Sequence, residues 1–179
     1  MKRNWIALLI AAMALNFAAC KKREKPIDPE SARIIEEAAR AWLDHEEKTP
    51  NSQKGPLTED ERQRVTIISV SDSSLSDLRP LVQYPELGLL ELYACPRLEE
   101  LAPLKRLPRL QFLTIVSCPG ITDLRPLIDV PRLGYLNVLE DAGIQEIPMG
   151  LRDKSGMSIV WRRAPTPTPG PTASETPAI

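Results

Sequence analysis

Side chains that commonly carry out chemistry are scarce in this chain. Its 179 residues include a single histidine, His45, and three cysteines. No second histidine or cysteine has metal-ligand spacing to His45, and no carboxylate pair, nucleophile–base set, phosphate-binding loop or zinc motif stands out. We therefore expect no catalytic residue, no bound metal and no cofactor, and we predict that the chain is not an enzyme.

The chain also lacks an excess of charge of one sign. Lysine and arginine number 23 and aspartate and glutamate 24, which gives a formal net charge of −1 at pH 7. Proteins that bind nucleic acid usually gather positive charge, because the phosphate backbone is strongly negative. The charge balance therefore predicts no nucleic acid among the partners of this chain.

A long apolar run is missing as well. The N-terminal apolar run from Trp5 to Leu15 has 11 residues, whereas a membrane-spanning helix needs roughly 20. Lys2 and Arg3 precede the run, and small residues follow it. A basic start, a short apolar centre and small residues before a cleavage site are typical of a secretory signal peptide. We assign residues 1–19 to such a peptide.

The end of that segment places a cysteine after small residues. The stretch Phe17-Ala18-Ala19-Cys20 resembles the lipobox of bacterial lipoproteins. This resemblance implies that Cys20 is lipidated, becomes the first residue of the mature chain and anchors it to a membrane. An ordinary secretory signal followed by a chance cysteine is the alternative interpretation.

Residues 20–27 form a basic tether in the lipoprotein interpretation. The cations are Lys21, Lys22, Arg23 and Lys25, and each adds about 1 kcal/mol of attraction to an anionic leaflet. Lys21 also stands where inner-membrane lipoproteins carry an aspartate retention signal. We therefore expect a lipid-anchored protein of the bacterial cell envelope, at the outer membrane.

Residues 28–64 predict a helical cap. Asp28-Pro29-Glu30 is typical of a helix start, because an acid caps the first free N–H groups and proline suits the first turn. The predicted helix ends near Lys48 and buries a face of apolar residues: Ile34, Ile35, Ala38, Ala41 and Trp42. Thr58 and Glu61 have the spacing of a capping box, which predicts a second, short helix.

From Leu87 to Ile144 an apolar residue falls on nearly every third position. The intervals from Leu87 to Leu110 and from Leu110 to Leu133 are both 23 residues, and each repeat contains the pattern L-x-x-L-x-L-x-x-C. This period predicts an α/β fold, a short leucine-rich repeat solenoid over residues 65–163. We expect a parallel sheet on the concave side, and irregular or 3₁₀ returns on the convex side because prolines recur there.

The cap and the first repeat together resemble a known family. The segments IDPESARIIEEAARAWL and GPLTEDERQRVTIISV are similar to the N-terminal cap of internalin-like bacterial leucine-rich repeat proteins. The resemblance covers Pro26 to about Trp161. It implies that a helix, a turn and a short helix close the N-terminal end of the solenoid, which would otherwise expose apolar core and a strand edge.

Cys95 and Cys118 occupy the same position in adjacent repeats. Strand spacing then places their Cα atoms about 5 Å apart, which permits a disulfide in an exported protein. The same position usually points inward, and stacked neighbours seldom have the S–S torsion that a disulfide needs. Two free, buried thiols are the favoured interpretation.

Residues between the buried leucines point to the outer surface of the sheet. We predict three outward columns: Ile67, Leu89, Phe112 and Tyr135; Ser69, Glu91, Thr114, Asn137 and Val160; and Ser71, Tyr93, Val116, Leu139 and Arg162. An apolar patch of this extent commonly marks a partner site. The predicted binding residues are Leu89, Tyr93, Phe112, Val116, Tyr135 and Leu139, with Glu91 and Asn137 between them.

Two alternatives to a binding patch stay open: the protein itself covers part of the patch, or strand propensity alone selected these residues.

Residues 164–179 are rich in proline and threonine and predict a disordered tail. The sequence thus favours a non-catalytic, lipid-anchored protein that binds a protein or peptide. A structural spacer lipoprotein without a specific ligand is the alternative.

Overall fold

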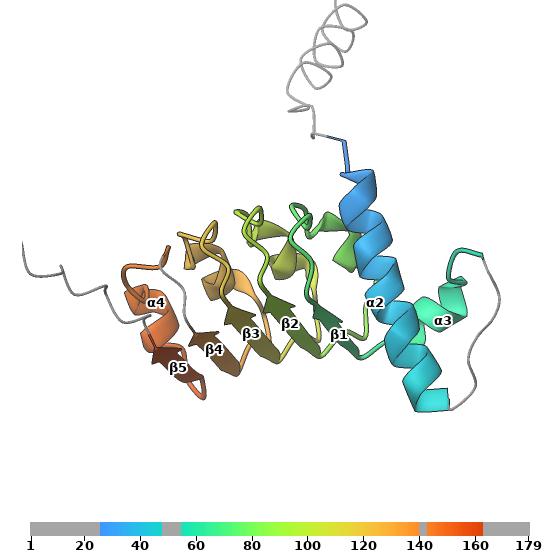
Figure 1. Ribbon diagram of the computed structural model, residues 1–179. Helices are drawn as coiled ribbons and strands as arrows, with labels where there is room; N and C mark the ends of the chain where they lie inside the picture. The colour runs from blue at the N-terminus through green and yellow to red at the C-terminus, as the bar shows by residue number, and fades with distance from the viewer. Residues whose placement is uncertain (1–25, 48–54, 140–142, 163–179) are drawn as a thin grey trace, which may run out of the picture.

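The computed structural model of the protein describes residues 26–47, 55–139 and 143–162 (Figure 1). The predicted signal peptide, Cys20, the tether up to Lys25 and the tail 164–179 lie outside the described residues. The described chain forms two N-terminal helices followed by a stack of strand-and-turn units that ends in a fifth strand. None of its helices is long and apolar enough to cross a bilayer.

Two capped helices precede the repeats. Helix α2 spans Pro29–Glu47, and the Asp28 carboxylate accepts a hydrogen bond of 2.9 Å from the Ser31 backbone N–H. Helix α3 spans Glu59–Arg64 and begins at a capping box: Thr58 N–H donates to the Glu61 carboxylate at 2.7 Å, and Glu61 N–H donates to Thr58 Oγ1 at 3.3 Å. Both predicted helix starts are confirmed.

The buried face of α2 differs in part from the prediction. Ile34 and Ile35 are buried, but so are Ala39 and Leu43, whereas Ala41 is exposed. Ile35, Ala39 and Leu43 follow one another at intervals of four, so they share one line along the helix. Ala41 is six residues after Ile35 and therefore lies about 120° away around the axis. The prediction that Ala41 is buried was wrong.

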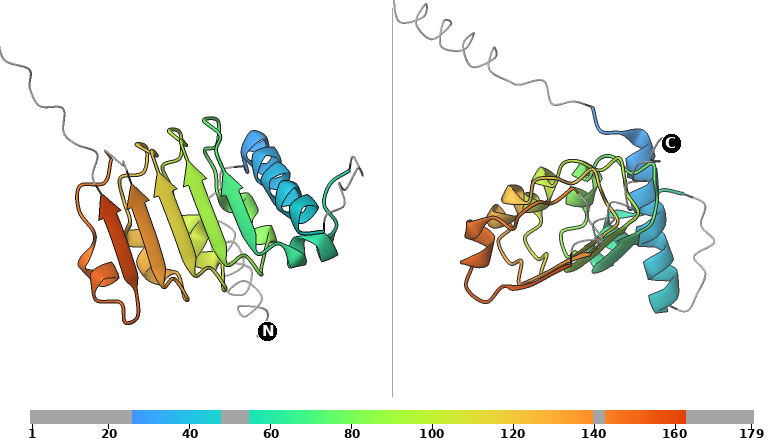
Figure 2. Two further views of the ribbon diagram at one scale, coloured as in Figure 1. Left: turned by 60° about the horizontal axis from the view of Figure 1, so that its bottom comes forward. Right: turned by 60° about the vertical axis from the view of Figure 1, so that its left-hand side comes forward.

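The repeats build one parallel sheet, shown in Figure 2. Its strands follow one another in chain order and are β1 (Ile67–Val70), β2 (Leu89–Tyr93), β3 (Phe112–Val116), β4 (Tyr135–Leu139) and β5 (Ser158–Arg162). Each residue pairs with the equivalent residue of the next repeat, such as Leu90 with Leu113 and Leu113 with Leu136. The 23-residue period therefore sets the register of the sheet.

Short 3₁₀ turns form the opposite layer. They are η1 (Arg79–Gln83), η2 (Ala102–Arg106) and η3 (Arg125–Asp129), and each has a proline in its first positions. A short helix, α4 (Met149–Arg152), takes this place in the last unit. The expected 3₁₀ returns are confirmed, because a proline at the start of each return loses no internal hydrogen bond there.

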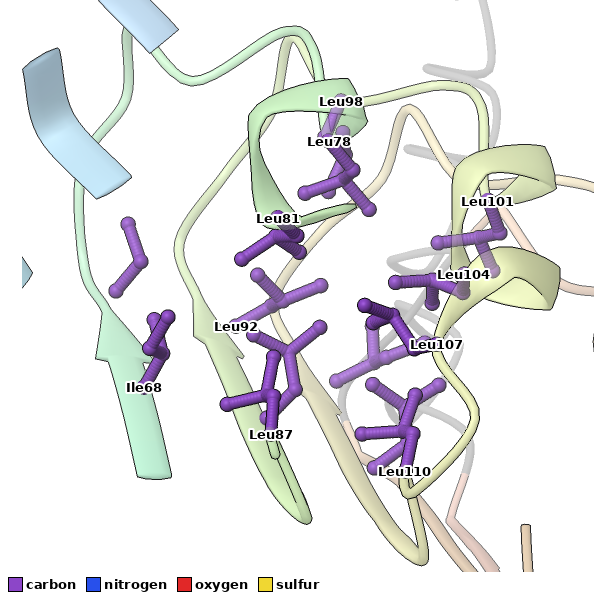
Figure 3. Packing of buried hydrophobic residues seen from close by; sticks show 14 of the residues in the cluster. Ile68, Leu78, Leu81, Leu87, Leu92, Leu98, Leu101, Leu104, Leu107 and Leu110 are labelled. Atoms are coloured by element: carbon purple, nitrogen blue, oxygen red, sulfur yellow. The ribbon is translucent and has the colours of Figure 1, made fainter. Parts of the chain in front are cut away.

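The core fills the space between the sheet and the 3₁₀ layer. Figure 3 shows leucines from both layers meeting there, among them Leu87 and Leu92 from the strand side and Leu101 and Leu104 from the turn side. All four are at most 1 % exposed. Every repeat thus buries its leucines against the layer opposite and against the next repeat, which is how a solenoid gains its stability.

Close stacking of the repeats depends on a glycine. A Cβ atom on Gly120 would lie 2.6 Å from the carbonyl oxygen of Pro96 in the preceding repeat. Real side chains do not tolerate such an approach to backbone, so any larger residue must push the two repeats apart. Gly143, one period later, packs in the same way against Pro119.

The two ends of the solenoid differ. At the N-terminal end, α2 lies beside β1 and packs against it (Figure 2). At the other end, β5 pairs with β4 and has no further strand beside it in the described chain. The cap therefore covers the β1 edge of the sheet, whereas β5 is the edge strand at the other end of the described chain.

Candidate functional site on the concave face

The face of the sheet that is turned away from the 3₁₀ layer is the concave face. Its three columns follow from the strand pairing: Ile67, Leu89, Phe112, Tyr135 and Ser158 in the first, Ser69, Glu91, Thr114, Asn137 and Val160 in the second, and Tyr93, Val116, Leu139 and Arg162 in the third. The predicted columns are confirmed, except that β1 ends at Val70 and Ser71 lies beyond the strand.

The six predicted apolar residues do come together on this face. We call Leu89, Tyr93, Phe112, Val116, Tyr135 and Leu139 the concave patch. Phe112 is 46 % exposed, and the other five side chains are half-buried. The rings of Phe112 and Tyr135 have centroids 6.1 Å apart and planes at 47°, a favourable tilted contact. The side chains thus cover one another in part and keep an accessible outer surface.

A line of polar side chains runs between the two apolar columns. Glu91 lies beside Tyr93, and partial burial together with this carboxylate raises the pKa of the Tyr93 hydroxyl. Asn137, two strands from Glu91, has a buried Oδ1 atom with no hydrogen-bond partner in the described part of the chain. The patch therefore combines apolar anchors with a central acidic group and an amide.

The two repeat cysteines lie beneath this face and contribute nothing to it. Both are free thiols with no exposed surface. The Cys95 thiol donates to the Tyr93 carbonyl at 3.2 Å, and the Cys118 thiol donates to the Val116 carbonyl at 3.3 Å. Each thiol thus satisfies a backbone acceptor at the end of a strand. The favoured prediction of two free, buried thiols agrees with this arrangement.

The convex side carries a second concavity that the sequence did not reveal. It measures about 570 Å³ and lies between the start of α2 and the turns η1 and η2. Its lining carries charges of both signs, and Arg79 pairs with Asp77 at 2.6 Å. No group of three metal-ligating side chains occurs in the ranges that the structure describes.

Comparison with known proteins finds similar folds among solved structures only. No protein-family model and no curated protein matches the sequence. Among solved structures, the chain is similar to internalin C2 from Listeria monocytogenes, with a TM-score of 0.56, 16 % identity, and coverage of 75 % of this chain and 54 % of that one. A second internalin from the same organism, inlF, has a TM-score of 0.48 and 17 % identity over 78 % of this chain and 46 % of its own.

The fold is therefore that of an internalin-like leucine-rich repeat solenoid with an N-terminal helical cap, as the resemblance of the cap sequence implied. The chain spans about half the length of internalin C2. Proteins of this architecture present an extended sheet surface that is suited to interaction.

Proposed function

We propose that this protein is a lipid-anchored component of the bacterial cell envelope that binds a protein or peptide through the concave patch, without catalysis. The observation that carries this proposal is the alignment of apolar side chains in two neighbouring columns over β2, β3 and β4. Aromatic residues in such a cluster are frequent anchors of interfaces, because each buries a large area at a low cost in conformational entropy.

The polar column supports a specific partner rather than a general apolar one. Glu91 and Asn137 lie between the apolar columns, so a bound surface has to match a negative charge and an amide as well as apolar area. Buried polar groups penalise partners that leave them unpaired. We expect the partner to place a hydrogen-bond donor or a cation opposite Glu91.

A pull-down from detergent-solubilised envelope tests the binding proposal. Full-length wild type is compared with Phe112→Asp and Tyr135→Asp, which place a charge in the concave patch. Val82→Asp is the matched control, because Val82 is 39 % exposed on the 3₁₀ side. We expect both patch variants to lose the captured partner and the control to retain it. Unchanged capture by both patch variants refutes the proposal and leaves the spacer role.

The anchor is tested separately. If Cys20 is lipidated, the wild type takes up a radiolabelled fatty acid and sediments with membranes, and Cys20→Ser loses both properties. Cys118→Ser is the matched control, since Cys118 is buried and donates to backbone carbonyls. A wild-type protein that is unlabelled and stays in the supernatant contradicts the anchor.

A further inference from the structure

The last strand of the solenoid leaves core side chains partly uncovered. In β4, the core-facing residues Leu136 and Val138 have no exposed surface. Their partners in β5, Ile159 and Trp161, are only half-buried, and so is Met157 just before the strand. Helix α4, at the same end of the stack in Figure 1, carries Met149, which is 75 % exposed. The C-terminal end of the solenoid thus leaves the core-facing side chains of β5 partly uncovered.

Some backbone N–H and C=O groups of β5 point away from the sheet. The Ser158 N–H donates to the Gly134 carbonyl at 2.7 Å, so the backbone N–H and C=O of Ser158 face the neighbouring strand β4. Successive residues of a strand direct their N–H and C=O groups to opposite sides. The N–H and C=O of Ile159 therefore point away from β4, to the side where a further strand would add.

The sequence of β5 contains none of the residues that commonly prevent a further strand from pairing with an edge strand. Natural edge strands commonly carry proline, inward-pointing charges or a bulge to prevent addition of another strand. The segment Ser158–Arg162 contains no proline, and its only charge is Arg162 at the end. At the opposite end, α2 packs on β1 and prevents the β5 edge of one molecule from adding to the β1 edge of the next.

We propose that the β5 edge is a homodimer interface, in which β5 of a second copy adds antiparallel about a two-fold axis at Ile159. In that register Ile159 faces its own copy and exchanges two backbone hydrogen bonds with it. Met157 lies opposite Trp161 of the second copy, so the three half-buried core residues of each chain cover one another.

This register brings no like charges together across the two-fold axis. Arg162 lies opposite Gly156 of the second copy, and Val160 lies opposite Ser158, so no like charges meet across the axis. Because the capped end cannot take part, the contact closes after two copies and does not extend into a filament. The two sheets become one continuous sheet of ten strands, and their concave faces lie on the same side.

Cross-linking of the full chain tests the register. With an oxidant, Ile159→Cys should form a disulfide between two copies, because facing residues of a hydrogen-bonded antiparallel pair have Cα atoms about 5.5 Å apart. Thr114→Cys, on β3, is the control and should give no species of twice the chain mass. Absence of that species for Ile159→Cys, or its equal yield for Thr114→Cys, overturns the proposal.

Sedimentation of the full chain in density-matched detergent tests the edge itself. Wild type should have the mass of two chains. Ile159→Pro removes the outward N–H but no bond to β4 and should sediment as one chain, while Ile159→Val keeps the N–H and should stay dimeric. Circular dichroism confirms that each variant is folded.

Other occupants of the edge give different results, and each overturns the proposal. If residues 163–179 cover β5, wild type is a single chain and ending the chain after Arg162 makes it dimeric. If a different protein covers β5, the wild type and the chain that ends after Arg162 both sediment as single chains. Phe112→Asp should leave the dimer intact, because the interface does not depend on the concave patch; failure of one proposal is thus distinguishable from failure of the other.

Discussion

The Ser31 hydroxyl oxygen accepts hydrogen bonds from the backbone N–H groups of Ser76 and Asp77, at 3.0 and 3.1 Å. The same hydroxyl donates to the Asp28 carboxylate at 2.6 Å. Ser31 has no exposed surface and is the only buried polar residue of the described chain. One side chain therefore joins the helical cap to the first turn of the solenoid, across 45 residues of sequence.

Replacement of Ser31 by alanine should loosen the cap. It leaves two backbone donors without their acceptor at a part-buried contact, which costs up to about 3 kcal/mol. Chemical denaturation followed by circular dichroism measures the loss. Ser73→Ala is the matched control, because Ser73 is exposed in the same repeat and should change stability little. Equal stability of Ser31→Ala and wild type contradicts the role of this contact.

Acid should weaken the same junction. Hydrogen bonds from Ser31 lower the pKa of Asp28 below its ordinary value of 3.8. Partial burial raises the pKa of Asp77, but hydrogen bonds from Arg79 outweigh it, so the pKa of Asp77 is also lowered from 3.8. The unfolded chain then binds more protons, so this stabilisation is complete above the ordinary pKa and is lost as the pH falls through the lowered value.

The melting temperature measured from about pH 5 downward tests this dependence. Asp28→Asn keeps a capping oxygen but cannot titrate, and we expect it to flatten part of the slope. Ser73→Ala, at an exposed position without a titrating group, should leave the slope as it is in wild type. A slope that is the same in all three proteins shows that Asp28 does not contribute.

Gly120→Ala should separate two repeats. The added Cβ meets the Pro96 carbonyl oxygen at 2.6 Å, a backbone atom that cannot move aside without shifting its repeat. Overpacking of this kind costs about 1–3 kcal/mol. Gly55→Ala is the control, since a Cβ there meets no atom within 4 Å. The denaturation midpoint should fall for Gly120→Ala alone; the account of repeat stacking is wrong if both variants match the wild type.

The fold was largely predictable because its main determinant repeats in the sequence. The period from Leu87 to Leu110 fixes which residues stack, so the strand register and the three outward columns follow without knowledge of the structure. The contact of Ser31 was not predictable, because it depends on how α2 docks onto a loop distant in sequence. Gly120 likewise reads as an ordinary turn residue until the preceding repeat is placed beneath it.

The site was predictable only in part, for a related reason. Alternation along a strand assigns Phe112 and Tyr135 to the concave face, but exposure depends on how neighbouring side chains cover one another. Phe112 is exposed, whereas Tyr135 is half-buried beside it. That no strand of the described chain lies beyond β5 became visible only with the ends of the solenoid in place, since its sequence continues the alternation of the other strands.

The two repeat cysteines should react only after unfolding. Both are fully buried and donate to carbonyls at the strand ends, so iodoacetamide should not label them in the native protein. After denaturation without a reductant, mass spectrometry should find both carrying the label. A denatured protein in which Cys95 and Cys118 resist labelling until a reductant is added contains a disulfide and contradicts this assignment.

Photocrosslinking in living cells tests the central claim, binding at the concave patch, most directly. A benzoylphenylalanine side chain replaces Phe112 in one protein and Val82, which is 39 % exposed on the opposite layer, in another. After irradiation, we predict that the residue at position 112 forms a discrete adduct with another envelope protein and that the residue at position 82 does not. An adduct from position 82 alone, or none from position 112, would contradict the claim.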